Sequence, residues 1–173
     1  MRQRSPLNTG WIFHAGFDPA WITLPLPGPS TRLPHAAVSL PWNYGNEHSY
    51  QQPFTYQRIL HWDPRFAEGE VVLHAEGAMA GAKVWINGEL VADHPDGYTP
   101  FEAWLSDHLI EGENLLTIHI DGSENPDIPP FGGRIDYLTY AGTYRDVWLD
   151  IRPAISIKNA KISVDDPPAD QPV

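Results

Sequence analysis

Apolar and polar residues alternate with a period of two along several short stretches of the chain, which is the pattern of β-strands that bury one face. Asn87-Gly88 lies between two of these stretches. Asn-Gly favours a two-residue hairpin turn of type I′, because both central residues need a positive φ. Strands separated by turns, without alternating helices, predict an all-β sandwich of the jelly-roll type. The stretches are residues 54–62, 70–77, 82–88, 89–94, 111–122 and 144–151.

Two regions carry weaker signals. Residues 1–41 are rich in proline and tryptophan, so we expect an irregular segment that wraps the sandwich, with one short strand at 37–40. Residues 101–110 contain a polar stretch that predicts a single helical turn capped by Ser106. The composition agrees with a β-rich chain, because eighteen prolines and fourteen glycines disfavour long helices.

The stretch 111–122 is expected to have one buried face and one face in contact with solvent. Its alternate positions differ in polarity. Elsewhere, Trp85 and Trp148 each lie among aliphatic residues, so both tryptophans are expected in the sandwich core. The apolar face of 111–122 consists of Leu116, Ile118 and Ile120, and the opposite face consists of Leu115, Thr117, His119 and Asp121.

After Pro153 the alternating pattern starts again in "AISIKNAKISV" and then ends in a tail rich in proline and aspartate. A strand that opens a new unit and then stops is typical of a chain cut shortly after a domain boundary. We therefore expect a first domain at 1–153 and, at 154–173, a linker with the start of a truncated second domain. A disordered natural tail is the alternative interpretation.

Charge and composition exclude several function classes. The net charge of −11 argues against nucleic acid and against an anionic membrane surface, which both need clustered Lys and Arg. The chain has no cysteine, and its eight histidines show no metal-ligand spacing, so no metal site and no cofactor are expected. No membrane span or apolar signal segment is found, which favours a cytoplasmic protein. A homo-oligomer remains compatible with these features.

Several motifs occur together in a fixed order. They are "LNTGWIFH", "VSLPWNYG", "VWINGELVADHPDGYTPF", "EGENLLTIHI" and "AGTYRDVWL". In this order the set resembles the N-terminal sugar-binding domain of glycoside hydrolase family 2, which contains β-galactosidases, β-glucuronidases and β-mannosidases. The resemblance covers residues 7–152. One departure is local: Leu40-Pro41 is followed by Trp42, where family members often have His and then Trp two residues further on.

The resemblance implies a galactose-binding-domain-like jelly roll, followed by an immunoglobulin-like domain that starts near Ala154 and then by a (β/α)₈ barrel. Family members are retaining glycosidases, and their two catalytic carboxylates lie in the barrel. A barrel needs about 250 residues, for which this chain has no room. We expect the chain to have no catalytic residues and to be inactive alone, with the barrel, the immunoglobulin-like domain and a terminal β-glycoside as its partners.

The resemblance also points to two substrate-binding residues. In β-galactosidases of the family, an aspartate six residues before the glycine of the G-x-[FY]-R-D-V motif contacts the sugar; here that glycine is Gly142 and the aspartate is Asp136. The alternative is a solvated loop aspartate paired with Arg134. A second family contact is the asparagine of an Asn-Pro pair, for which Gln52-Pro53 is the comparable pair, although its spacing is one residue shorter.

Three functions from different classes remain open at this point. The first is a non-catalytic domain that helps to form the active-site rim of a family 2 glycosidase, and the sequence is most similar to β-galactosidases. The second is a stand-alone carbohydrate-binding module, since jelly rolls often have that role. The third is a purely structural interface domain. Arg145 in the "YRDVWL" motif could bind a sugar, but an arginine at the start of a strand commonly tethers a loop or a neighbouring domain, and we expect that role.

Overall fold

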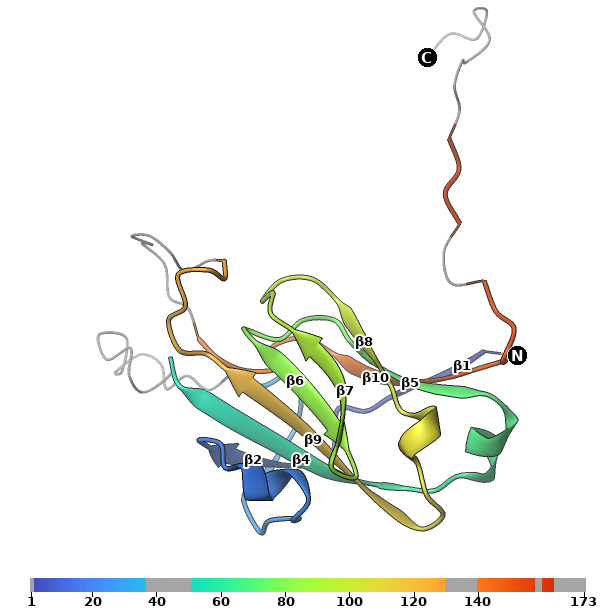
Figure 1. Ribbon diagram of the computed structural model, residues 1–173, viewed down its shortest axis with the longest axis horizontal. Helices are drawn as coiled ribbons and strands as arrows, with labels where there is room; N and C mark the ends of the chain where they lie inside the picture. Colours follow the sequence, from blue (N-terminus) through green and yellow to red (C-terminus); the bar gives the residue numbers. More distant parts are fainter. Residues whose placement is uncertain (1, 37–50, 130–139, 158–159, 164–173) are drawn as a thin grey trace, which may run out of the picture.

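A computed structural model describes residues 2–36, 51–129, 140–157 and 160–163, and these residues form two antiparallel sheets packed face to face (Figure 1). The four-stranded sheet has the order β1-β10-β5-β8, with β1 Gln3–Pro6, β5 Glu70–Ala75, β8 Phe101–Trp104 and β10 Val147–Arg152. The six-stranded sheet has the order β3-β2-β4-β9-β6-β7, with β2 Trp11–Ala15, β3 Ser30–Thr31, β4 Pro53–His61, β6 Ala82–Ile86, β7 Glu89–His94 and β9 Glu113–Asp121. The predicted all-β sandwich is confirmed.

The two sheets share one hydrophobic core. Alternate residues of each strand point inward, so the period-two pattern of the sequence becomes a continuous apolar layer between the sheets. Burial of this layer supplies the main stabilising free energy of the domain. The largest fully buried apolar side chains are Trp11, Tyr56, Leu33, Leu73, Ile86, Leu105, Leu116, Ile118 and Ile120.

The N-terminal region is more regular than its composition predicts. It supplies β1 to the small sheet and β2 and β3 to the large sheet, together with the short 3₁₀ helix η1 (Pro19–Ile22). Short strands bounded by proline lack the alternation that would reveal them, and their pairing partners are far away in the sequence. The predicted strand at 37–40 lies outside the described residues.

Part of this N-terminal region covers the outer face of the large sheet. The buried amide of Gln57 donates to the carbonyl oxygens of Trp21 and Leu24 and accepts from the Leu26 N–H, which holds the segment against β4. Phe17 stacks on His119 with ring centroids 4.2 Å apart. The expectation that one face of the β9 strand contacts solvent is therefore wrong, since seven of its nine residues are buried.

The same cover corrects the expected place of Trp85. Its side chain is 8% exposed, but it stacks on Phe17 outside the sandwich core, with ring centroids 5.7 Å apart. The predicted hairpin turn at Asn87-Gly88 is confirmed, with φ values of 50° and 94°. The predicted helical turn is the 3₁₀ helix η4 (Ser106–His108); its N-cap is Leu105, and the Ser106 hydroxyl instead accepts the Val71 N–H at 2.7 Å.

Beyond β10 the chain leaves the sandwich, beside the N-terminal strand β1 (Figure 1). The described residues of 154–163 form no strand, and Ile155, Ile157 and Ile162 are 95%, 87% and 90% exposed. The expected first strand of an immunoglobulin-like domain is thus not observed in these residues. The division at residue 153 stays a prediction.

Candidate functional site

One end of the sandwich gathers most of the irregular chain, and we call it the loop end. Strand β4 begins there and β9 ends there, because Pro53 pairs with Asp121. Strands β5 and β7 also end at the loop end, while β6, β8 and β10 begin at it. The described residues that flank segments 37–50 and 130–139 lie at this end as well (Figure 1).

Asp136, the predicted sugar contact, lies within 130–139 and hence outside the described residues. Backbone hydrogen bonds occur in the described chain on both sides of that segment. Before it, the Ile128 N–H donates to the carbonyl oxygen of Asn125 at 3.0 Å. After it, Met79 and Gly142 exchange two backbone hydrogen bonds, each 3.0 Å long. The chain after the segment of Asp136 is therefore anchored to the sandwich, whereas the hydrogen bond before it lies within a local turn.

Two glycines allow backbone segments to meet closely at the loop end. A Cβ on Gly142 would lie 2.4 Å from the carbonyl oxygen of His35. A Cβ on Gly122 would lie 2.2 Å from the Cβ of Ala141 and 3.2 Å from the carbonyl oxygen of Gln52. No side chain fits in either gap. Gln52, which is half-buried, thus lies against the chain that follows the segment of Asp136.

A groove of about 360 Å³ opens at the loop end, and we call it the loop-end groove. It is bounded by the ends of β6, β7 and β9 and by the turns that follow β7 and β9. Its polar lining is Lys83, Asp93, Asp121, Ser123, Glu124 and Asn125, and its apolar lining is Ala80, Pro95, Pro126 and Ile128, with Gly81 between them.

Local hydrogen bonds shape the polar wall of the groove. The Ser123 N–H donates to the Asp121 carboxylate at 3.1 Å, and the Asp127 N–H donates to the Asn125 side-chain oxygen at 3.0 Å. Such turns are typical of Asx residues. Across the groove, the Lys83 ammonium lies 3.5 Å from a carboxylate oxygen of Asp93. This arrangement can donate hydrogen bonds to hydroxyl groups and accept them, but it holds no reactive pair.

Sequence reasoning did not predict the loop-end groove. Its lining comes from separate parts of the chain that only the sheet register brings together. The available signal was the run of turn-forming polar residues from Asp121 to Asn125 after a strong strand.

Comparison with known proteins shows which family the chain resembles in sequence and in fold. Residues 34–153 match the family model described as "Glycosyl hydrolases family 2, sugar binding domain". The chain belongs to this family. As an individual relative, the β-galactosidase of Rhizobium meliloti is 50% identical over 136 residues, which are 75% of this chain and 17% of that protein. The β-galactosidase of Thermoanaerobacterium thermosulfurigenes is 38% identical over 167 residues, which are 94% of this chain and 23% of that protein.

Solved structures agree with the sequence comparison. The crystal structure of Bacteroides uniformis β-glucuronidase is similar with a TM-score of 0.77 and 29% identity, and the match covers 88% of this chain and 18% of that one. The family 2 domain described here thus spans between 17 and 23% of the length of these relatives. The prediction of a family 2 sugar-binding domain is confirmed, and a stand-alone module is not favoured.

A second set of contacts fixes the loops of the family 2 domain near β10. The Tyr144 hydroxyl donates to the carbonyl oxygen of Gly97 at 2.7 Å. Arg145 donates to the carbonyl oxygens of Glu76 and Tyr98, both at 3.3 Å. The prediction that Arg145 tethers a loop is confirmed by these contacts.

A hydrogen-bonded pair, buried Tyr56 and half-buried His35, supports the chain that precedes segment 37–50. The Tyr56 hydroxyl and His35 Nδ1 lie 2.8 Å apart, and the His35 N–H donates to the carbonyl oxygen of Thr143 at 2.8 Å. Burial raises the pKa of Tyr56 and lowers the pKa of His35, so both side chains are neutral at pH 7. The two neutral side chains thus hold the chain at His35 against β4.

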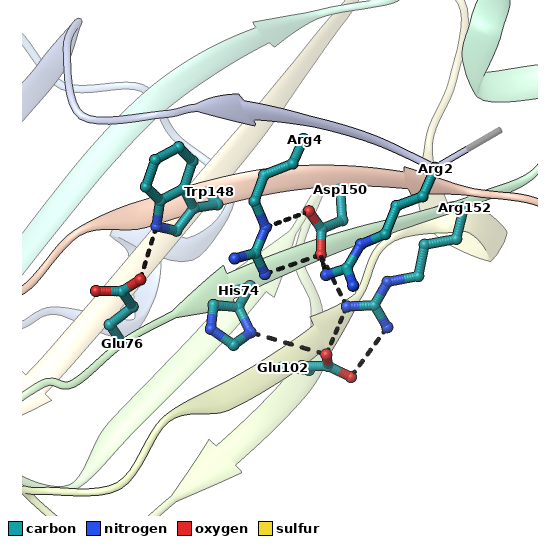
Figure 2. A network of polar contacts seen from close by, with 8 residues as sticks. All are labelled: Arg2, Arg4, His74, Glu76, Glu102, Trp148, Asp150 and Arg152. Atoms are coloured by element: carbon teal, nitrogen blue, oxygen red, sulfur yellow. Dashed lines mark hydrogen bonds and ion pairs between the residues drawn. The ribbon is translucent and has the colours of Figure 1, made fainter. Parts of the chain in front are cut away.

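The outer face of the small sheet carries a polar network that is separate from the lining of the groove (Figure 2). Asp150 is fully buried there and accepts hydrogen bonds from Arg2, Arg4 and Arg152. Burial alone would raise the pKa of Asp150, but the three guanidinium groups hold it below its ordinary value. Glu102 pairs with Arg152 beside them and raises the pKa of that arginine.

Trp148 belongs to this outer network and not to the sandwich core, which corrects the expectation from sequence. Its indole N–H donates to a carboxylate oxygen of Glu76 at 3.0 Å, and the Arg4 guanidinium lies 5.5 Å from its ring centroid. Alternation along β10 explains the difference, because Val147 and Leu149 point inward and Trp148 points outward.

Two searches of the described part of the chain bear on other functions. No group of three or more His, Asp or Glu side chains there is arranged to hold a metal ion. No helix found among those residues is long and apolar enough to cross a membrane.

Proposed function

We propose that this family 2 domain is the non-catalytic N-terminal part of a retaining β-galactosidase and that its loop end forms part of the active-site rim. The observation that carries the proposal is the convergence of Gln52, Gly122 and Ala141 at the loop end. Asp136 is five positions before Ala141, and a chain of that length spans at most about 17 Å. The cytoplasmic location expected from the sequence is part of this proposal.

Galactosides are proposed as substrates because of the relatives. The 50% identity to a β-galactosidase exceeds the 29% identity to the β-glucuronidase of Felis catus. The two catalytic carboxylates would come from a barrel domain of the parent enzyme, after an immunoglobulin-like domain. The role of the loop end is to bind and orient the sugar: the Asp136 carboxylate accepts two hydroxyl hydrogen bonds, and the Gln52 amide offers one donor or acceptor.

The test uses the full-length parent enzyme with Asp136→Ala, Asp136→Asn and Gln52→Ala. We expect kcat/KM for an aryl β-galactoside to fall at least tenfold in both Asp136 variants, because a charged hydrogen bond is lost in each, and less in Gln52→Ala. The matched control is Asp107→Asn, an exposed aspartate in η4 at the opposite end of the sandwich. Wild-type kinetics in Asp136→Ala would contradict the proposal, as would a preference of the parent for β-glucuronides.

The alternative of an autonomous carbohydrate-binding module makes a different prediction. A complete lectin site binds its sugar by itself, whereas a rim domain supplies only part of a pocket. We therefore expect the 173-residue chain to bind galactose and glucuronate more weakly than about 1 mM. A dissociation constant well below that value in calorimetric titration would favour the module.

A further inference from the structure

The loop-end groove has the size of a small-molecule site. Its volume of about 360 Å³ lies in the range of roughly 300–1,000 Å³ that is typical of ligand pockets. Its frame is rigid, because Asp121 ends the long strand β9 and Lys83 and Asp93 face each other across the β6–β7 pair. The Gly81 N–H also donates to the carbonyl oxygen of Pro95 at 3.1 Å, which closes the turn beside the groove.

The lining of the groove combines the two kinds of surface that a sugar ring needs. One wall consists of hydroxyl, amide and carboxylate groups from Ser123, Asn125 and Asp121. The bond from the Ser123 N–H uses one acceptor site of Asp121, and a carboxylate has about four. Asn125 uses its oxygen within its own turn, and its amide N–H groups can donate. Apolar contact comes from Pro95, Pro126, Ile128 and Ala80.

The charge of the lining selects among sugars. Among the described residues that line the groove, Asp93, Asp121 and Glu124 are three carboxylates and Lys83 is the one cation, which already lies near Asp93. These described residues carry a net charge of about −2 and therefore repel a carboxylate or phosphate group on a ligand. A metal ion is not favoured as the occupant, because the carboxylates of the described residues do not form a metal-binding group.

We propose that the loop-end groove is a binding subsite for one uncharged hexose unit of an extended β-galactoside, distinct from the sugar contact assigned to Asp136. The subsite excludes uronic acids. This inference rests on the proposed function for the source of its ligand, an uncharged saccharide. Its affinity is in the millimolar range, because the groove is open to solvent and the described residues that line it include no aromatic side chain.

The first experiment is a titration of the 173-residue chain followed by amide NMR. With galactose and with lactose we expect saturable shifts at millimolar concentration, confined to Gly81 and residues 121–128. With glucuronate at equal concentration and ionic strength we expect no shifts in these amides. Absence of shifts with both uncharged sugars, equal shifts with glucuronate, or shifts located elsewhere would overturn the subsite. Shifts that appear only with CaCl₂ would also overturn it, in favour of a cation site.

The second experiment changes the groove itself. Asn125→Ala should raise the dissociation constant for lactose roughly fivefold, the effect of one lost hydrogen bond. Glu124→Lys should allow glucuronate to bind, because the net charge of the lining moves from about −2 to about zero. Glu111→Lys is the matched control: it makes the same change at an exposed turn before β9, at the opposite end of that strand. Equal effects of the two lysine variants would contradict a charge effect inside the groove.

The two proposals fail separately. The kinetics of Asp136 variants with a small aryl galactoside do not involve the groove, and the NMR titration does not involve catalysis. Loss of rim function with an intact titration would leave the subsite standing, and the reverse result would leave the rim standing.

Discussion

Gly142→Ala tests how closely the backbone is packed at the loop end. The glycine has φ = +146°, and an added Cβ would lie 2.4 Å from the carbonyl oxygen of His35 and 2.9 Å from the Cα of Ala36. Both atoms are backbone, so the contact is relieved only if one of the two segments moves. Strain at such a φ costs about 1–3 kcal/mol, and overpacking adds about 1–3 kcal/mol. We expect the free energy of unfolding to fall by about 2–6 kcal/mol.

The control for this change is Gly112→Ala. Gly112 has φ = +99° and no heavy atom within 4 Å of an added Cβ, so that variant carries the conformational strain without the clash. Urea unfolding followed by tryptophan fluorescence would measure both variants. Gly142→Ala should also lower kcat/KM of the parent enzyme, because it displaces the anchor after Asp136, and Gly112→Ala should not. A loss of stability in Gly142→Ala no greater than in Gly112→Ala would refute the reasoning.

Three further variants test contacts elsewhere in the domain. Asn114→Ala should lower the free energy of unfolding, measured by calorimetry, by about 2–4 kcal/mol. The buried Asn114 amide forms hydrogen bonds with the backbone of Ile110 and Leu60 and with the side chain of Asn87, and a loss under about 1 kcal/mol would contradict this account. Gln57→Leu should speed hydrogen exchange and proteolysis within residues 18–28, and unchanged protection there would show that the amide does not hold the cover. Asp150 has a folded-state pKa below its ordinary value of about 3.9, so the stability it contributes is present above about pH 4 and is lost as the pH falls. Asp150→Asn should flatten the dependence of the melting temperature on pH below 4, and an unchanged slope would contradict the linkage.

The strands that sequence predicted best are those whose signal is local. Asn87-Gly88 fixes its hairpin through the φ values of two adjacent residues, and its prediction was correct. The solvent-facing side expected for the β9 strand was wrong, because Phe17, about a hundred residues earlier in the chain, stacks on His119. A polar residue in an alternating pattern shows which face it is on, but not whether another segment covers that face.

The candidate site was predicted less completely than the fold. Gln52 was proposed as a sugar contact because Gln52-Pro53 is comparable to an Asn-Pro pair of the family. Its approach to Ala141 is possible because Gly122 between them has no side chain, and no local sequence pattern reveals that contact. The groove depends on sheet register in the same way, since Lys83 and Asp121 come together only across neighbouring strands. Asp136 stays a prediction, because it lies outside the described residues.

The pairing of the first strand with the last has a consequence for how this domain folds as it is synthesised. Arg4 and Asp150 are 146 positions apart, and among the strands that the structure describes β1 pairs only with β10. The small sheet therefore cannot close until about 150 residues have left the ribosome. Contacts of such long sequence separation make folding slow. Until then the nascent chain exposes the apolar strand β5 on one edge, where a chaperone that binds extended apolar segments would have its best opportunity to act.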